Sequence, residues 1–144
     1  MSQYEEKNLS RNYVAIDNKG KFVSLMCLAA SLLKVDDLIQ PGESYPKNID
    51  LPTIKIGRLV VDKRYFKKRI GERTLLKAIS IFVEISKRIG VIGLTVDAKK
   101  ESVGFYQKYG FKDLNPKQDK DFVPMILYTH ILRSRRPSLF EDPV

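Results

Sequence analysis

Apolar residues in the first part of the chain fall into short runs separated by polar residues. Two of these runs, residues 13–16 and 22–28, flank the sequence Asp17-Asn18-Lys19-Gly20, which is rich in turn-forming residues. Two apolar runs around a short polar turn are typical of a β-hairpin. We therefore expect the first two strands of a sheet at these positions.

Three later runs also predict strands, at residues 53–61, 91–96 and 122–132. Residues 29–39 fit a short helix as well as a continuation of the second strand. The segment 40–52 contains three prolines and a glycine, and this composition predicts a loop. Loops of that length in compact domains often face a substrate.

Residues 70–89 instead have a helical period. Their apolar positions recur at intervals of three and four: Leu75, Ala78, Ile79, Phe82, Ile85 and Ile89. Gly90 is expected to end this helix, and a second helix is predicted over residues 100–108, stopped by Gly110 in the left-handed conformation. The order β-β-β-α-β-α-β predicts an α/β (α+β) fold with a mixed, mostly antiparallel sheet and flanking helices.

The composition is that of a soluble globular chain, with 144 residues, 43% of them hydrophobic and 30% charged. We expect one domain over residues 1–144, with a polar segment at 1–11 and a basic tail at 133–144. Residues 1–11 are too polar for a signal peptide, and no apolar stretch has transmembrane length. These features predict a cytoplasmic protein without a membrane partner.

Cysteine and histidine are too scarce for several kinds of site. The single Cys27 excludes an internal disulfide and a CxxC metal site, and its apolar surroundings predict a packed side chain. The single His130 is expected to end an apolar strand in a structural role. We therefore expect no metal and no Ser-His or Cys-His nucleophile.

A strong positive charge changes the picture further. The formal net charge is +9 and the sequence pI is about 9.6. A charge of this size attracts polyanions, phosphorylated cofactors or acidic partners. It does not choose between them.

The positive charge is concentrated in the turn between the third strand and the long helix, which has the features of a phosphate cradle. A helix that begins near residue 70 directs free backbone N–H groups and the positive end of its dipole at this turn. The basic residues of the turn and first helical turn are Lys67, Lys68, Arg69 and Arg73, beside Ile70 and Gly71. This arrangement suits a pyrophosphate, but a basic turn is also often only a solvated surface.

A family resemblance becomes visible at residues 96–114, VDAKKESVGFYQKYGFKDL. The strand ending in alanine and the sequence FYQKYGF resemble the closing half of the GNAT superfamily of acyl-CoA-dependent N-acetyltransferases. The sequence IGRLVVDKRY at residues 56–65 is similar to the acetyl-CoA motif in the branch that contains tRNA-acetylating toxins of toxin-antitoxin pairs. The resemblance covers roughly residues 12–132 and implies a GNAT-like acyl-CoA N-acyltransferase fold.

This resemblance implies a role for each matching residue. Three residues of the third strand, Leu59, Val60 and Val61, would offer backbone groups to the pantetheine amides of acetyl-CoA. The pyrophosphate would be held by Lys67, Lys68, Arg69, Ile70, Gly71 and Arg73. Phe105 would pack beside the cofactor, and Tyr106 would be the general acid. Without the resemblance, Tyr106 would read as an amphipathic aromatic residue whose hydroxyl reaches solvent.

The residue types fit direct attack of a primary amine on the thioester. Such a reaction needs two positioned reactants, a stabilised oxyanion and a protonated thiolate. A tyrosine with a pKa of about 10 can supply that proton. No general base is evident, which favours an α-amine with a pKa near 8 over a lysine amine.

Two features depart from the family pattern. The family's turn has characteristic residues at three positions, which in this chain are Phe66, Arg69 and Gly71. Only the last of these, Gly71, keeps the glycine of the family pattern. The N-terminus before residue 13 is shorter than the family's, so part of the acceptor wall is expected to be absent. An apolar sheet edge would then favour a homodimer.

Three classes of function follow. The first is an N-acetyltransferase that uses acetyl-CoA and acts on the α-amine of aminoacyl-tRNA, with an antitoxin protein as a partner; a protein or small-molecule acceptor is the alternative. The second is a catalytically reduced CoA-binding regulatory protein. The third is a basic nucleic-acid-binding module, although the aromatic and glycine signature of common RNA-binding modules is absent.

Overall fold

The computed structural model of the chain describes residues 7–34, 45–46, 49–66, 68–114 and 121–142. A six-stranded sheet has the order β1-β2-β3-β4-β6-β5. Its strands are β1 (Arg11–Ile16), β2 (Phe22–Lys34), β3 (Asp50–Val61), β4 (Gly93–Lys99), β5 (Lys112–Asp113) and β6 (Phe122–Tyr128). Only β3 and β4 pair in parallel, so the predicted mixed, mostly antiparallel sheet is confirmed.

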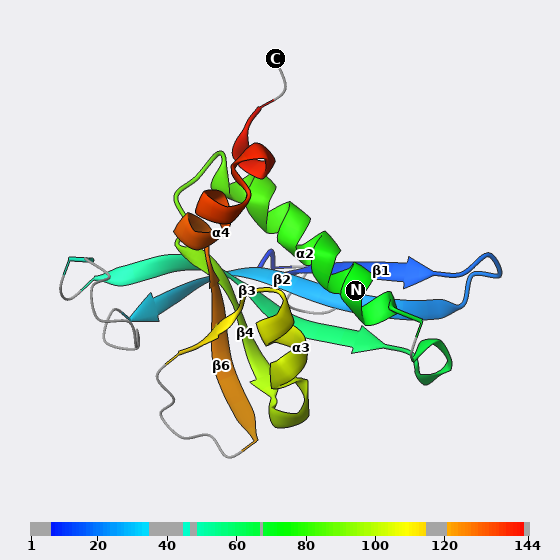
Figure 1. Ribbon diagram of the computed structural model, residues 1–144. Coiled ribbons are helices and arrows are strands. Elements are labelled where there is room, and N and C mark those ends of the chain that lie inside the picture. The colour runs from blue at the N-terminus through cyan, green and yellow to red at the C-terminus, as the bar shows by residue number, and fades with distance from the viewer. Residues whose placement is uncertain (1–6, 35–44, 47–48, 67, 115–120, 143–144) are drawn as a thin grey trace.

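Helices flank this sheet, as predicted (Figure 1). They are η2 (Lys63–Tyr65), α2 (Ile70–Ser86), η3 (Lys100–Ser102), α3 (Val103–Lys108), α4 (Thr129–Arg135) and η4 (Pro137–Phe140). Figure 1 shows α2 lying across the β1–β2–β3 half of the sheet, whereas α3 lies beside β4. In the described part of the chain, no helix is long and apolar enough to cross a bilayer.

The main core lies between α2 and the sheet. The apolar stripe of α2 buries Leu75, Ala78 and Phe82 completely against Met26 of β2 and Ile56 of β3. Fully burying a side chain such as that of Phe82 stabilises a fold by about 1.5–3 kcal/mol. This burial fixes the position of the N-terminus of α2 relative to the end of β3.

The chain leaves the sheet earlier than the sequence predicts. The final strand was expected to run to residue 132, but β6 ends at Tyr128 and α4 begins at Thr129. Tyr128 lies opposite Gly93, the first residue of β4, so a longer β6 would have no partner on that side. Thr129 turns the chain: its N–H donates to Ile92 O at 2.8 Å and its hydroxyl donates to Val91 O at 2.7 Å.

Two sequence-based expectations for the C-terminal region are therefore wrong. His130 lies in α4 and does not end a strand. The basic segment 133–144 is not only a tail, because it contains the end of α4 and all of η4. The guanidinium of Arg133 lies 5.0 Å from the ring centre of Phe140 and helps to join these two helices.

Element boundaries differ in smaller ways. Residues 29–34 continue β2, which settles their ambiguity, whereas residues 35–39 lie outside the described part. The predicted loop 40–52 is shorter, because β3 already begins at Asp50; within that range, 40–44 and 47–48 lie outside the described residues. The long helix ends at Ser86, β4 begins at Gly93, and the short β5 was not predicted. Gly110 has the expected positive φ, +95°.

Candidate active site

Strands β3 and β4 separate soon after they meet. They pair only where Ile54, Lys55 and Ile56 lie opposite Leu94, Thr95 and Val96. Figure 1 shows the two strands diverging beyond this point. A bulge on the other edge of β3 accompanies the divergence, because Cys27 pairs with Arg58 and Leu28 with Ile56, which leaves Gly57 unpaired. A bulge bends a strand and increases its twist.

The divergence opens a cavity of about 750 Å³, here called the cleft. Its walls include the consecutive residues 56–61 of β3 and 96–99 of β4. Because alternate side chains of a strand point to opposite faces, a cavity lined by consecutive residues runs between the strands. The backbone of Leu59, Val60 and Val61 borders the cleft without pairing to β4. Extended backbone of this kind can bind the amides of a linear ligand.

Tyr106 closes the cleft from the side of α3. Its side chain is 6% exposed and packs edge to face against Phe105 and Phe111, with ring centres 5.2 and 5.4 Å away. Burial raises the pKa of the Tyr106 hydroxyl, and no hydrogen bond to another described residue contributes to that rise. Its hydroxyl therefore stays protonated at neutral pH and can donate a proton or hydrogen bond.

The helix that follows β3 begins with an unusual residue. Arg69 is the N-cap of α2 and has left-handed backbone angles, φ 59° and ψ 20°, without a side-chain capping bond. This conformation costs a residue with a Cβ roughly 1–2 kcal/mol. Arg69 O accepts the N–H of Arg73 at 3.1 Å, so the N–H groups of residues 70–72 precede the first intrahelical donor. They are the donors that an anion needs.

Several predicted site residues lie around these free N–H groups. Lys68, Arg69 and Arg73 are exposed, whereas Lys67 lies outside the described residues. A Cβ at Gly71 would lie 3.7 Å from Val61 Cγ2 and 3.9 Å from Phe105 Cζ. The end of β3, the start of α2 and the ring of Phe105 therefore meet at Gly71. Ile70, the remaining predicted residue, is half-buried as the first residue of α2.

A carboxylate also lies in the first turn of α2. Glu72 accepts a hydrogen bond from the Tyr109 hydroxyl, which lowers the pKa of Glu72 and raises that of Tyr109. The charges of Lys108, Arg69 and Arg73 lower the pKa of Glu72 further. This bond joins the start of α2 to the residue that follows α3.

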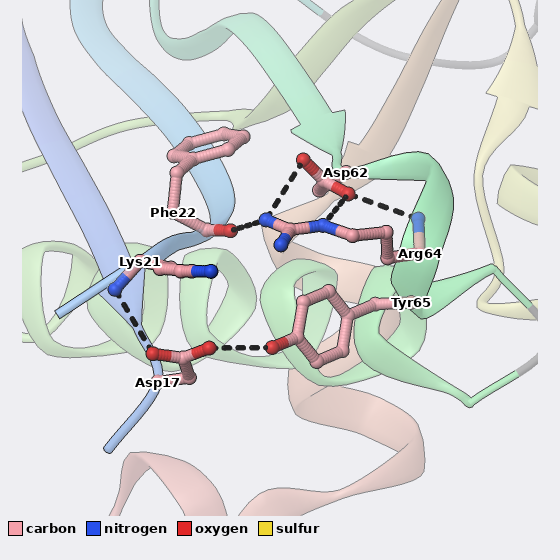
Figure 2. Close-up of polar contacts among 6 residues, drawn as sticks. All are labelled: Asp17, Lys21, Phe22, Asp62, Arg64 and Tyr65. Carbon is pink, nitrogen blue, oxygen red and sulfur yellow. Dashed lines mark hydrogen bonds and ion pairs between the residues drawn. The ribbon is translucent and has the colours of Figure 1, made fainter. Parts of the chain in front are cut away.

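The turn between β3 and α2 is held by a polar network that the sequence does not predict (Figure 2). Asp62 Oδ1 accepts the backbone N–H of Arg64 at 2.9 Å and its Nε at 3.0 Å. The side chain of Arg64 also donates to Phe22 O at 3.4 Å. The Tyr65 hydroxyl donates to Asp17 Oδ2 at 2.9 Å. Arg64 thus supports the turn through its contacts with Asp62 and Phe22.

Both acids of this network have lowered pKa values. Asp17 accepts backbone N–H groups of Lys21 and Lys19 besides the Tyr65 hydroxyl, and the Lys21 bond contributes most to its lowered pKa. Hydrogen bonds from Arg64 lower the pKa of Asp62. The sequence signal for this network was weak, because an acid after a strand usually caps a turn locally.

A second hollow of about 570 Å³ adjoins the turn from the other side, between β1 and α2. Its lining includes Tyr65, Ile70, Arg73 and Lys77. Arg73 and Lys77 of α2 therefore line this second hollow, whereas the cations that line the cleft are Arg58 and Lys99.

Comparison with known proteins identifies a matching family and several structures with a similar fold. The family model described as an acetyltransferase (GNAT) domain matches residues 47–132. The structure of AtaT complexed with acetyl-methionyl-tRNAfMet is 18% identical, with a TM-score of 0.80, over 92% of this chain and 79% of that chain. For AtaTR bound with AcCoA the values are 20% identity, a TM-score of 0.71, and 92% and 78% coverage.

A Tyr-to-Phe mutant of KacT is also similar, with 20% identity and a TM-score of 0.75 over 92% of this chain and 79% of that chain. At these identities the likeness shows a shared fold. The matched family range contains the cleft, the start of α2 and Tyr106.

Proposed function

Because this chain belongs to the GNAT acetyltransferase family, we propose that it transfers the acetyl group of acetyl-CoA to the α-amine of an aminoacyl-tRNA. The observation that carries this proposal is the cleft between β3 and β4, which is lined by Tyr106 and by Val61, and Val61 lies beside Gly71 at the start of α2. A thioester placed there would lie within reach of an acid and beside an anion site.

Acetyl-CoA would bind along the end of β3. In this proposal the pantetheine amides bond to the backbone of Leu59, Val60 and Val61. The pyrophosphate is held by the N–H groups at Ile70 and Gly71 and by the charges of Lys67, Lys68, Arg69 and Arg73. Phe105 packs beside the cofactor, close to Gly71.

The chemistry is direct transfer without a protein nucleophile. The amine attacks the thioester carbonyl, a backbone N–H near Val61 stabilises the oxyanion, and the C–S bond then breaks. Tyr106 donates its proton to the departing thiolate. The raised pKa of Tyr106 suits this role, because the group is then fully protonated at neutral pH.

The acceptor is inferred from charge and from the similar structures. One pyrophosphate does not use all the cations near the turn, and Arg133, Arg135 and Arg136 add more at α4. A tRNA supplies phosphates for these cations, and its aminoacyl group supplies an amine with a pKa near 8. The complex of AtaT with acetyl-methionyl-tRNAfMet supports this acceptor.

The same comparison supports a protein partner. AtaT has been solved bound to the C-terminus of the antitoxin AtaR, and KacTA in complex with DNA. We propose a cognate antitoxin for this chain, a cytoplasmic location where aminoacyl-tRNA is found, and a single acetyltransferase domain. The edge strand β1 exposes Val14 and Ile16, which are 58% and 63% exposed, and this edge is our candidate for a homodimer contact.

A second candidate function is a CoA-binding regulatory protein with reduced catalysis. The strained Arg69 favours it, because the turn lacks the glycine that such a conformation prefers. Release of free thiol from acetyl-CoA in the presence of charged tRNA tests the choice between the two. The enzyme should release thiol at a rate that falls steeply as salt is raised, because each phosphate contact releases counterions. Binding of acetyl-CoA without release of CoA thiol in the presence of any amine would favour the regulatory protein.

A further inference from the structure

The face of the sheet opposite α2 carries an ion pair at the point where the cleft begins. Val96 and Ala98 belong to the core with Tyr106, so the intervening Asp97 points to the opposite face. Lys55 lies between the buried Ile54 and Ile56 and points to that face as well. Lys55 Nζ and Asp97 Oδ2 are 2.9 Å apart.

The position of this ion pair follows from the strand register. The last paired residues of β3 and β4 are Ile56 and Val96, and Asp97 is the next residue of β4. Asp97 is one of the residues that line the cleft, as is Tyr106. It also lines a small hollow of about 90 Å³, which it shares with Lys55. Asp97 therefore lies where the cleft opens onto the face of the sheet opposite α2.

We propose that the Asp97 carboxylate binds the ammonium group of the acceptor, which takes the place of the Lys55 ammonium. This inference rests on the proposed acetyl transfer to an amine, but not on the acceptor being tRNA. The ammonium groups of Lys55 and of the acceptor are chemically alike. The observed Lys55–Asp97 ion pair therefore shows the contact that the acceptor ammonium would make with Asp97. Exposed pairs of this kind are weak, and the side chains of Lys55 and Asp97 are 40% and 52% exposed.

The charges around the cleft explain why such a carboxylate is needed. Arg58 and Lys99 line the cleft and repel an incoming ammonium group. These cations attract the phosphates of a polyanionic acceptor. They therefore favour binding of its phosphate backbone and disfavour binding of its ammonium group. Asp97 offsets that repulsion where the acceptor enters. Glu101, the other carboxylate of the lining, lies beyond β4 in η3.

The acetyl transfer balances without a proton acceptor in the protein. The bound ammonium loses one proton to water, and the neutral nitrogen forms a bond to the carbonyl carbon. The C–S bond breaks, the thiolate takes the Tyr106 proton, and the nitrogen loses its second proton to solvent, from which Tyr106 is reprotonated. The products are an N-acetylated amine, free CoA thiol and one released proton. Asp97 positions the amine and takes no proton in these steps.

The test is steady-state kinetics with charged tRNA and, in parallel, an amino-acid ester with a free α-amine as acceptors. We expect Asp97→Asn to raise KM for either acceptor about tenfold, with acetyl-CoA affinity unchanged, because a charge-assisted contact is lost. Asp97→Glu should restore most of the affinity, and Lys55→Met should lower KM or leave it unchanged. Asp50→Asn, which removes an exposed carboxylate at the far end of β3, is the matched control and should behave as wild type.

Either of two results would overturn the inference while acetyl transfer stands. One is an unchanged KM in Asp97→Asn, and the other is a Lys55→Met variant that loses as much acceptor affinity as Asp97→Asn. The second result would show that the pair only supports the strands. A smaller KM increase for Glu101→Gln than for Asp97→Asn is expected, and the reverse order would move the amine contact to η3. A wild-type protein that acetylates no amine would remove the proposed function and this inference together.

Discussion

The Tyr65 hydroxyl donates a hydrogen bond of 2.9 Å to Asp17 Oδ2, which joins the turn before α2 to the β1–β2 hairpin (Figure 2). Arg64 makes a second connection to that hairpin, through Phe22 O. The turn that carries the proposed pyrophosphate contacts is thus positioned by residues from the beginning of the chain. This relationship makes acetyl-CoA affinity depend on residues outside the cleft.

Tyr65→Phe should weaken acetyl-CoA binding without removing any proposed ligand contact. The variant loses one hydrogen bond that holds the turn, and a roughly two- to tenfold rise in Kd is expected. Isothermal titration calorimetry with acetyl-CoA measures this change. Asp17→Asn should give an effect of similar size, and an unchanged Kd in both variants would separate the hairpin from cofactor binding.

The same network predicts how stability depends on pH. The folded-state pKa of Asp17 is lowered, so its hydrogen bonds stabilise the fold above the unfolded-state pKa, near 4. That stabilisation is lost as the pH falls through the lowered folded-state pKa. Thermal unfolding of wild type and Asp17→Asn should therefore differ at pH 7 and converge below about pH 4. A constant difference down to pH 2 would contradict this account.

Substitutions of Arg69 separate backbone strain from charge. Glycine at this position relieves the left-handed conformation, so Arg69→Gly should be more stable than Arg69→Ala by about 1 kcal/mol. Both variants lack the guanidinium and should bind acetyl-CoA more weakly than wild type does. Chemical denaturation and calorimetry measure the two effects. Equal stability of the two variants would mean that the left-handed turn is not populated in solution.

The sequence was sufficient for most of the elements but not for their ends. Apolar runs located β2 and β3, and a helical period located α2, because each buries apolar side chains in the core. No residue of β1 is buried, and its sequence signal was the turn that joins it to β2. The end of β6 at Tyr128 could not be read from its apolar run, because it depends on where its partner β4 begins. The two-residue β5 has no period at all, and it exists only through pairing with β6.

The local structure around the predicted site residues could be read from the sequence. Tyr106 lines the cleft and Gly71 lies in the first turn of α2, and their roles in catalysis and cofactor binding stay predictions. The sequence could not show that Arg69 adopts a left-handed conformation or that Arg64 pairs with Asp62. The glycine in β3 was a usable signal for a bulge, since glycine inside a strand often marks one.

Tyr106→Phe should separate catalysis from binding. The ring still packs against Phe105 and Phe111, so acetyl-CoA affinity should change little. Turnover should fall about a hundredfold or more, because the thiolate leaves without its acid. Tyr109→Phe is the comparison, since it removes a hydroxyl that bonds Glu72 and does not line the cleft. A Tyr106→Phe variant with nearly wild-type turnover would make this tyrosine a packing residue.

The most direct test of the central claim offers radiolabelled acetyl-CoA to charged tRNA, uncharged tRNA and lysine-rich peptides in parallel. We expect label on charged tRNA alone, because that acceptor combines a polyanion with an α-amine that deprotonates readily. The label should be released with the amino acid when the ester bond to the tRNA is hydrolysed. Label on the peptides and none on charged tRNA would contradict the proposed acceptor, and no label on any amine would contradict acetyl transfer itself.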